Sequence, residues 1–225
     1  MTKLVLFDFD GTLADTAPDL GAAANVLRRR RGLADLPLEN YRQYASHGAR
    51  GLLRASLGMA PDHPEYEAVR DEFLTEYERG MTRYAALFPG IRELLNTLQQ
   101  AGYIWGIVTN KVEYLALPLV EYLGLHTHCA ITVGGDTTPH PKPHPAPLLH
   151  AAEKTGFDPI DAIYIGDDER DIIAGHAAGM ATVVAAYGYC GTGTAIRGWN
   201  ATAIAEHPDQ LWGVIQHWAQ NGRKA

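Results

Sequence analysis

Two aspartates that stand two residues apart, directly after a short apolar run, offer the clearest chemistry in this 225-residue sequence. The run 3–7 is rich in Leu, Val and Phe and precedes a glycine-bearing turn, which predicts a buried strand. Because side chains alternate along an extended chain, Asp8 and Asp10 are expected to project to the same side. Such carboxylates repel each other unless a cation lies between them or one holds a proton. With a metal ion they suit phosphoryl transfer, in which one attacks phosphorus and the other handles the leaving-group proton.

The turn that carries Asp8 and Asp10 has a second interpretation. Asp-Gly-Thr is ordinary turn chemistry, and an acidic turn can simply begin the next helix. The rest of the chain favours the chemical interpretation, because three further polar segments occur where predicted strands end or predicted helices begin.

Thr109 and Asn110 follow the apolar run 103–108, which predicts another strand. A threonine at the carboxyl end of a parallel strand, just before a helix, places its hydroxyl and exposed backbone N–H groups where an anion can bind. Helix capping is the alternative, since Thr and Asn are favoured N-caps in any α/β protein.

Lys142 lies in a proline-rich segment, residues 137–147, between a predicted strand and a predicted helix. Alternating prolines stiffen the chain into an extended path, and a lysine held there can act as a fixed positive charge near a phosphate. A surface lysine and a proline-rich ligand for a partner domain are the alternatives. Neither explains why the segment sits between a strand and a helix of the core.

Asp167 ends the apolar run 162–165, and Asp171 follows four residues later, one turn into the next predicted helix. Together with the first aspartate pair, these carboxylates can surround one Mg²⁺, with water in the remaining positions. The alternative is a helix start enriched in acids, which complements the helix dipole.

The pattern of the chain changes at Pro89-Gly90. Before this point, helical patterns cover roughly 18–31, 37–46, 49–57 and 64–85, and no strand signal interrupts residues 17–86. After it, helices are expected at 91–101, 112–123, 146–155, 168–178 and 208–218, and strands at 103–108, 130–133, 162–165, 181–185 and 202–204. Such alternation predicts right-handed βαβ units and a parallel sheet. The fold class is therefore α/β, with an all-helical domain, residues 17–86, inserted into a core formed by residues 1–16 and 87–225.

The composition favours a protein with a buried core and argues against nucleic-acid-binding, membrane-spanning and secreted proteins. With 46% hydrophobic and 20% charged residues the chain can bury a core, and its net charge of −7 argues against nonspecific nucleic-acid binding. The basic run 28–31 is interpreted as favourable charge at the end of a helix. No apolar run predicts a membrane span or a secretory signal. Cys129 and Cys190 are most simply reduced thiols, so a cytoplasmic location is expected.

The segment DFDGTLADT, residues 8–16, resembles the first motif of the haloacid dehalogenase (HAD) superfamily. The other segments are similar to the remaining superfamily motifs, in the same order: a strand ending in Thr, a K-P-x-P-x-x-L pattern at 142–148, and G-D-x-x-x-D at 166–171. The resemblance implies a Rossmann-like core with a helical cap inserted after the first strand, in agreement with the alternating pattern.

The resemblance also implies catalytic roles for the motif residues. Asp8 would be the nucleophile that becomes an aspartyl phosphate, and Asp10 would be the general acid and base. Thr109 and Asn110 would hold phosphate oxygens, and Lys142 would supply a fixed positive charge.

A metal site is implied in the same way. Mg²⁺ would be bound by Asp8, Asp10 and Asp167, with Asp171 as an outer-shell or water-mediated partner. Asp168 stands where relatives often have Ser, so the hydrogen bonding around the site is expected to differ there.

The turn 46–51 of the predicted cap carries His47, Gly48 and Arg50 and resembles the substrate-specificity loop of phosphoglycolate phosphatases. Arg50 suits a bidentate contact with a substrate carboxylate; an arginine in solvent at a helix start is the alternative. Segments 105–111, 166–172 and 186–189 are also similar to N-acetylmuramic acid 6-phosphate phosphatases of cell-wall recycling.

These resemblances imply Mg²⁺-dependent hydrolysis of a small carboxylate-bearing phosphomonoester such as phosphoglycolate. Hydrolysis of the muramic ester, or a sugar phosphomutase activity, is the alternative. A dehalogenase is disfavoured, because Asp10 suits proton delivery to an alkoxide. The expected partner is a small phosphorylated metabolite rather than nucleic acid or a membrane, and both a monomer and a homodimer are compatible with the sequence.

Overall fold

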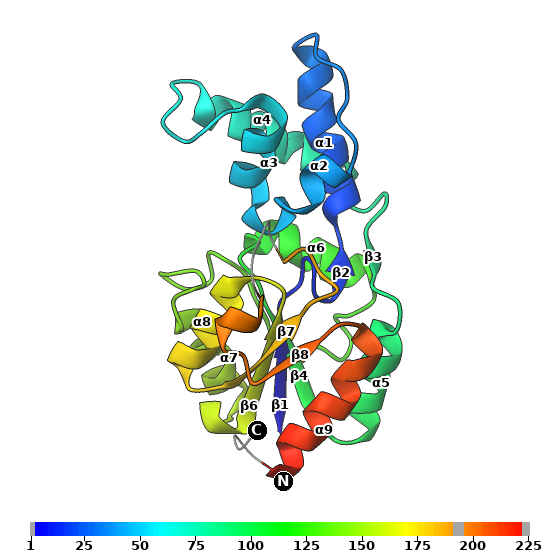
Figure 1. Cartoon of the computed structure of the whole chain (residues 1–225), viewed down its shortest axis with the longest axis vertical. Helices are drawn as coiled ribbons and strands as arrows, with labels where there is room; N and C mark the ends of the chain where they lie inside the picture. The colour runs from blue at the N-terminus through cyan, green and yellow to red at the C-terminus, as the bar shows by residue number, and fades with distance from the viewer. Residues whose placement is uncertain (1–2, 191–195, 222–225) are drawn as a thin grey trace.

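The computed structural model describes residues 3–190 and 196–221. Within them, six parallel strands form one sheet in the order β5-β4-β1-β6-β7-β8 (Figure 1). The strands are β1 (Leu4–Phe7), β4 (Ile104–Val108), β5 (Thr132–Val133), β6 (Ala162–Gly166), β7 (Ala181–Ala185) and β8 (Ala203–Ala205). Strand β1 lies between β4 and β6, so the loops that follow these three strands meet at one edge of the sheet.

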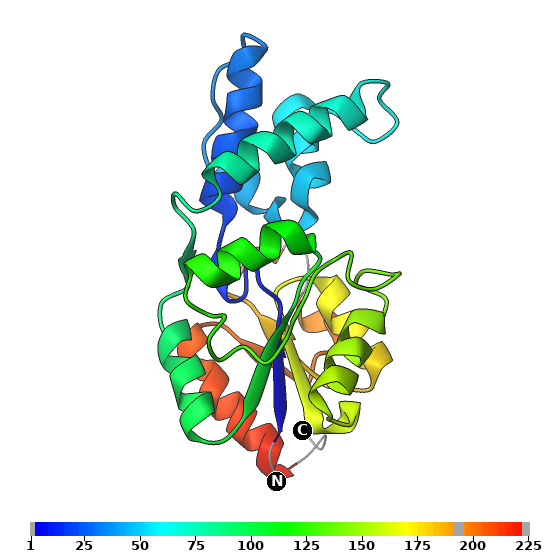
Figure 2. The same ribbon diagram turned by 180° about the vertical axis from the view of Figure 1, so that it is seen from behind.

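Helices cover both faces of this sheet. α5 (Ile91–Gln100) and α9 (Leu211–Asn221) lie on one face, and α7 (Ala146–Thr155) and α8 (Glu169–Ala178) on the other (Figure 1, Figure 2). α6 (Glu113–Tyr122) lies nearer the carboxyl ends of the strands (Figure 2). Burial on both faces explains why the strands are continuous apolar runs. No helix in the described ranges is long and apolar enough to cross a membrane.

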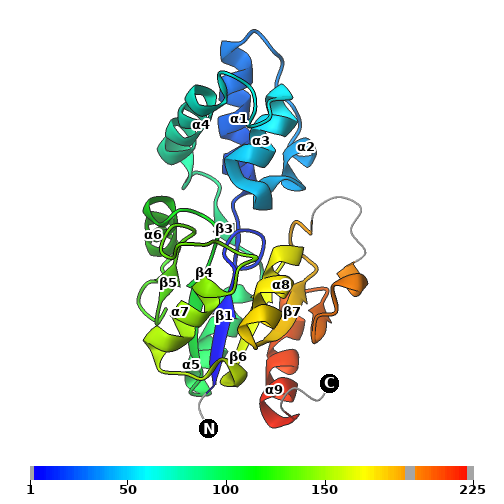
Figure 3. The ribbon, with the colours of Figure 1, turned by 90° about the vertical axis from the view of Figure 1, so that its left-hand side faces the viewer.

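Four consecutive helices form a separate group, here called the helical block, beyond the carboxyl ends of the strands (Figure 3). They are α1 (Ala17–Arg30), α2 (Glu39–Arg42), α3 (Gly48–Leu57) and α4 (Tyr66–Gly80). The block packs around fully buried side chains from each helix, among them Leu27, Tyr41, Leu52 and Phe73.

The basic run at the end of α1 faces the acidic side of α4. Arg30 bonds to Glu72 (2.9 Å) and Glu76 (2.8 Å), and Arg31 bonds to Glu72 (2.7 Å). These ion pairs are partly exposed, so each contributes little to stability, but together they fix how α1 lies against α4.

Two short strands connect the helical block to the core. β2 (Ala14–Asp15) pairs antiparallel with β3 (Ala86–Leu87), so the chain leaves and re-enters the core at adjacent points. The buried Asp19 carboxylate strengthens this junction by accepting hydrogen bonds from the backbone N–H groups of Tyr84 (3.0 Å) and Ala85 (2.9 Å).

Two of the expected helices differ from those observed. The segment 37–46 forms α2 and then a separate 3₁₀ turn, Ala45–His47, in which the carbonyl of Ser46 accepts a hydrogen bond from Arg170 of the core. The segment 64–85 is helical only over Tyr66–Gly80, and beyond it the backbone N–H groups of Tyr84 and Ala85 donate to Asp19 rather than to helix carbonyls. Contacts with distant residues override the local helical pattern in both places.

Candidate active site

Asp8 is the first residue after β1, and its surroundings come from the two neighbouring strands. Its backbone N–H donates to the Ile165 carbonyl of β6 (2.8 Å), and the residue is only 7% exposed. Thr109 follows β4 and Asp167 follows β6. Thr109 and Asp167 are 101 and 159 positions from Asp8 in the chain, yet they lie at the ends of the two strands adjacent to β1.

Lys142 lies between two buried carboxylates. Its Nζ is 2.9 Å from Asp8 Oδ1 and 2.7 Å from Asp171 Oδ1, and it donates to the Tyr164 hydroxyl (2.7 Å). Burial alone would lower the pKa of this lysine, but Asp171 and Asp8 raise the pKa above its usual value. Lys142 is therefore a buried, permanently charged cation beside Asp8.

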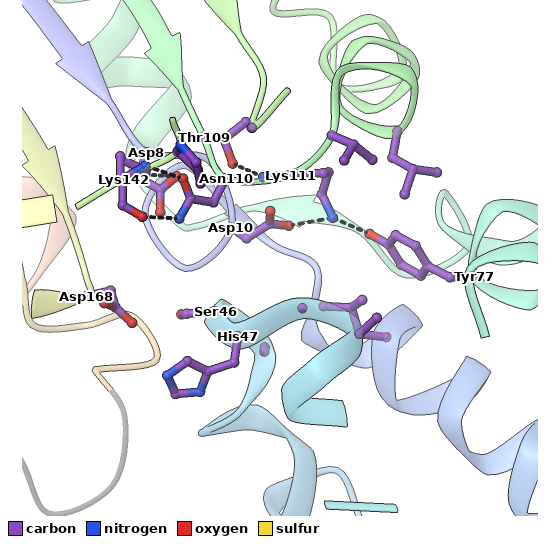
Figure 4. Close-up of a pocket in the computed structure, with 18 of the residues that line it drawn as sticks. Asp8, Asp10, Ser46, His47, Tyr77, Thr109, Asn110, Lys111, Lys142 and Asp168 are labelled. Carbon is purple, nitrogen blue, oxygen red and sulfur yellow. Dashed lines mark hydrogen bonds and ion pairs between the residues drawn. The ribbon is translucent and has the colours of Figure 1, made fainter. Parts of the chain in front are cut away.

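Asn110 fixes the segment that carries Lys142. Its side-chain amide donates to the Lys142 carbonyl (2.9 Å) and accepts from the Lys142 backbone N–H (2.9 Å), as Figure 4 shows. The amide thus positions the lysine, and Asn110 also lines the cavity; the contact with phosphate oxygens that the resemblance implies stays a prediction. Thr109 is 2% exposed, and its hydroxyl accepts from the Lys111 N–H (3.1 Å), so it does not cap α6.

A group of three buried carboxylates lies next to this lysine. Asp8, Asp167 and Asp171 each offer an oxygen within 4.8 Å of the others. Burial raises the pKa of Asp8 to about 7, an effect that Lys142 opposes and Asp171 increases. Burial and the Asp8 charge likewise raise the pKa of Asp167 well above its usual range. Without a cation, these carboxylates are costly to ionise together.

The three carboxylates fit a metal ion. Oδ1 of Asp8 is buried and accepts no well-directed hydrogen bond; Lys142 Nζ lies 2.9 Å from it, and a metal ion would be a further partner. Carboxylate oxygens are the ligands that hard divalent cations prefer. Gly11 allows this crowding: its φ is +88°, and a Cβ there would collide with the Asp167 carboxylate.

The Asp10 carboxylate is not part of this group. It accepts a hydrogen bond from the Thr16 hydroxyl and lies 3.2 Å from Lys111 Nζ, with Tyr77 next to the lysine (Figure 4). The structure therefore separates the two aspartates of the first motif: Asp8 faces Lys142 and the other acids, and Asp10 faces a second lysine.

The turn of the helical block that the sequence singles out reaches the site only in part. Ser46, His47 and Gly48 line the cavity above Asp8, and the Ser46 hydroxyl donates to Asp167 Oδ2 (3.3 Å). Burial, and then the charge of Arg170, lower the pKa of His47. Arg50 instead lines a neighbouring groove, outside the cavity that contains Asp8.

Asp168 has a definite role in the local structure. It caps α8 by accepting from the Arg170 N–H (2.9 Å), and Asp171 completes the capping box through the Asp168 N–H (3.0 Å). The Arg170 side chain also bonds to both Asp168 oxygens (2.8 and 2.9 Å). Arg170 lies on the cavity wall and donates to the Ser46 carbonyl (2.7 Å).

Most of the catalytic candidates border one cavity of about 560 Å³ between the core and the helical block; Asp167 and Arg50 are not among its lining residues. Its floor holds Asp8, Asp10, Thr109 and Lys142, and much of its remaining wall is apolar. The apolar lining residues include Leu20, Phe73, Leu74, Val112 and Leu115. A cavity of this size accommodates a small organic ligand.

Several residues of the site were assigned no role from the sequence, among them Tyr77, Lys111, Tyr164 and Arg170. Lys111 directly follows the Thr-Asn pair and Arg170 lies within the last motif, so their positions were signals that could have been used. Nothing in the local sequence marks the two tyrosines, because their partners are distant in the chain.

Comparisons with known proteins agree with this geometry. Residues 5–185 match the family model described as haloacid dehalogenase-like hydrolase. A phosphoglycolate phosphatase of Xanthomonas campestris pv. campestris is 44% identical over 210 residues, which cover 93% of this chain and 95% of that protein. An N-acetylmuramic acid 6-phosphate phosphatase of Pseudomonas aeruginosa is 40% identical over 213 residues, covering 95% of this chain and 94% of that protein.

A solved structure has the same fold. The crystal structure of a predicted phosphoglycolate phosphatase from Haemophilus somnus is 27% identical, with a TM-score of 0.85, and covers 96% of this chain and 98% of that chain. The family model matches residues 5–185, the phosphatase relative covers 93% of the chain, and Asp8, Asp10, Lys142 and Asp171 line one cavity. The chain therefore belongs to the haloacid dehalogenase-like hydrolase family and is a phosphoric monoester hydrolase.

Proposed function

We propose that this protein is a Mg²⁺-dependent phosphatase that hydrolyses a small carboxylate-bearing phosphomonoester through an aspartyl phosphate on Asp8. The observation that carries the proposal is the position of Asp8: it is buried, 2.9 Å from the Lys142 ammonium, and within 4.8 Å of two further carboxylates. A carboxylate held in this way beside fixed positive charge suits attack on a phosphate ester.

In the first step, an Asp8 oxygen attacks phosphorus, so that a bond from phosphorus to Asp8 forms while the bond to the ester oxygen breaks. Lys142 balances charge on the transferred group, and the Thr109 hydroxyl lies beside it. Asp10 gives its proton to the leaving alkoxide. The two carboxylates must have different surroundings, because Asp8 has to attack as an ionised nucleophile while Asp10 has to donate a proton.

In the second step, water attacks the phosphorus of the aspartyl phosphate and loses a proton to Asp10. The bond between Asp8 and phosphorus breaks, phosphate leaves, and both aspartates return to their starting states. Ser46, His47 and Gly48 of the helical block cover the cavity and limit the access of bulk water during the first step.

Asp8 and Asp167 would bind Mg²⁺ directly. Asp171 would act in the outer shell, which is supported by the engagement of both its oxygens with Lys142 and the Asp168 N–H. When bound, Mg²⁺ supplies positive charge against the phosphoryl oxygens and allows the acids to be ionised together. We do not assign the Asp10 carboxylate to the metal, because it bonds to Thr16 and Lys111 instead.

The test is phosphate release from a panel of phosphate esters by the wild type, by Asp8→Asn and by the exposed control Asp62→Asn. Asp8→Asn is expected to retain less than about one per cent of wild-type turnover, because an amide is a poor nucleophile. Acid quenching with a radiolabelled ester is expected to leave hydroxylamine-sensitive label on the wild type and none on Asp8→Asn. Substantial turnover by Asp8→Asn, or no label on the wild type under single-turnover conditions, would contradict the proposal.

The cavity favours a second candidate substrate, N-acetylmuramic acid 6-phosphate. A volume of about 560 Å³ with an extensive apolar wall is larger than a two-carbon acid requires, and a relative of 40% identity carries that substrate in its name. Comparing kcat/KM for phosphoglycolate and for the muramic ester in the same panel decides between the two.

A further inference from the structure

Lys111 is a buried lysine in the cavity that the proposed reaction does not use. It lies between β4 and α6, and its side chain is only 8% exposed. Its Nζ is 3.2 Å from Asp10 Oδ1 and donates to the Tyr77 hydroxyl (3.0 Å), as Figure 4 shows. Burial opposes the charge, but Asp10 and Tyr77 hold the pKa well above its usual value, so Lys111 is an ammonium at neutral pH.

This ammonium retains hydrogen-bonding capacity. A lysine ammonium carries three N–H donors, and in the described part of the chain Asp10 and Tyr77 receive two of them. The third has no acceptor there. A buried donor without a partner is costly, so a ligand oxygen that reaches it gains a favourable contact.

Two other cations around the cavity, Lys142 and Arg170, are more fully engaged. Lys142 lies between Asp8 and Asp171, and the Arg170 guanidinium bonds to both oxygens of Asp168. Arg70 pairs with Glu67 (2.6 Å) and Asp71 (3.2 Å), but its buried Nε has no hydrogen-bond partner among the described residues.

The wall near Lys111 is largely apolar. Val112 and Leu115 follow it in the chain, and Phe73 and Leu74 face the cavity from α4. Lys111 and the Tyr77 hydroxyl therefore supply polar groups in a largely apolar part of the cavity wall, and Lys111 lies next to Asp10, the proposed general acid.

We propose that Lys111 is a specificity-determining residue, whose remaining N–H donates to an oxygen of the leaving group close to the ester oxygen, and that Tyr77 orients it. The inference rests on the proposed function. Asp10 must approach the ester oxygen to about 2.8 Å to protonate it, and Lys111 is 3.2 Å from Asp10. The recognised oxygen must therefore be separated from the ester oxygen by only two or three carbon atoms.

Two kinds of leaving group supply such an oxygen. One is the carboxylate of a phosphorylated 2-hydroxy acid, and the other is the ring oxygen or a hydroxyl of a sugar 6-phosphate. The shared chemistry is a hydrogen-bond acceptor near the ester carbon. Substrate pairs with and without such acceptors distinguish the two sources.

The experiment measures kcat/KM for two pairs of esters with the wild type and Lys111→Met. Phosphoglycolate is paired with ethyl phosphate, and glucose 6-phosphate with cyclohexylmethyl phosphate. Methionine keeps an unbranched chain of similar length and removes the donor. The ratio within a pair cancels any effect of the substitution on Asp10, because Asp10 acts on both members.

Lys111→Met is expected to lower the ratio of one pair roughly ten- to a hundredfold, as for the loss of a hydrogen bond to a charged group. A lower ratio for phosphoglycolate against ethyl phosphate identifies the carboxylate as the group that Lys111 binds. A lower ratio for glucose 6-phosphate against cyclohexylmethyl phosphate identifies a sugar oxygen. Lys154→Met, at an exposed lysine of α7, is expected to leave both ratios unchanged. Equal losses on all four esters would overturn the proposal, because they would show that Lys111 acts only through Asp10.

Tyr77→Phe tests whether the Tyr77 hydroxyl orients Lys111, since the substitution keeps the ring and removes the hydroxyl. It is expected to lower the same ratio by a smaller factor, and an unchanged ratio would overturn the role of Tyr77. Failure of the proposed function has a different signature: the wild type would release phosphate from none of the esters.

Discussion

Arg170, at the start of α8, donates a hydrogen bond to the backbone carbonyl of Ser46 in the helical block, across 2.7 Å. The same guanidinium bonds to both oxygens of Asp168. The turn that covers the cavity is thus tied to the helix that begins beside Asp167, and the Ser46 hydroxyl reaches the Asp167 carboxylate directly. The helical block and the acid cluster are therefore connected in two ways, through Arg170 and through the Ser46 hydroxyl.

Replacing Arg170 by lysine is expected to lower kcat/KM on every ester about tenfold, because lysine cannot bond to Asp168 and Ser46 in the same forked geometry. The melting temperature should change little, since the guanidinium is partly exposed. Steady-state kinetics and thermal denaturation check this, with the exposed Arg197→Lys as control. Wild-type kinetics for Arg170→Lys would show that the contact has no influence on turnover.

Arg50→Ala should distinguish esters by the length of the leaving group. Arg50 lies in the groove outside the cavity, with Arg54 and Tyr44. Phosphoglycolate is too short to reach this groove from Asp8, so its turnover should be nearly unaffected. A sugar phosphate with a carboxylate across the ring is long enough, and its kcat/KM should fall roughly tenfold. A selective loss on phosphoglycolate would instead place Arg50 in the cavity during turnover.

The metal-free protein is expected to lose stability as the pH rises from about 4 to about 7. Burial raises the pKa of Asp8 to about 7, whereas in the unfolded chain it has its ordinary, lower value. Between these two pKa values the folded state binds more protons than the unfolded state, so stability falls with rising pH. His47 acts in the opposite sense, because burial lowers its pKa.

Asp8→Asn isolates the aspartate, since His47 is present in both proteins. Its unfolding free energy, measured in urea with a chelator present, should fall less steeply with pH than that of the wild type. Parallel curves for the two proteins would mean that Asp8 does not hold a proton in this range.

Mg²⁺ should raise the melting temperature of the wild type, because a ligand that binds only the folded state stabilises it. Asp167→Asn should largely remove this rise, and the neighbouring Glu169→Gln, which is not in the carboxylate group, should keep it. Scanning calorimetry with and without Mg²⁺ gives the comparison. An equal rise in Asp167→Asn would exclude Asp167 as a ligand.

The sheet and its loops were predictable from the sequence because each part depends on a short segment. Apolar runs gave the strand positions to within two residues, and parallel connections brought Asp8, Thr109 and Asp167 to the same edge. Helix α6 formed over the expected residues although Pro118 lies within it.

The contacts between the core and the helical block were not predictable in this way. Lys111 and Tyr77 are 34 positions apart, and Arg170 and Ser46 are 124 positions apart. Such pairs depend on how two packed bodies meet, and no local periodicity encodes that. For the same reason, the placement of Arg50 outside the cavity could not be inferred from its proximity to His47 in the sequence.

The pairing of β2 with β3 has a consequence for how this architecture can diversify. Ala14 lies opposite Leu87 and Asp15 opposite Ala86, so the two ends of the helical insert are held together whatever lies between them. Lengthening or replacing the insert then adds only a small entropic cost, which grows slowly with the number of residues. The paired strands β2 and β3 thus give the core a constant point of insertion. Helical inserts of different sequence and length can be accommodated there, so substrate specificity can change while the reacting residues of the core stay the same.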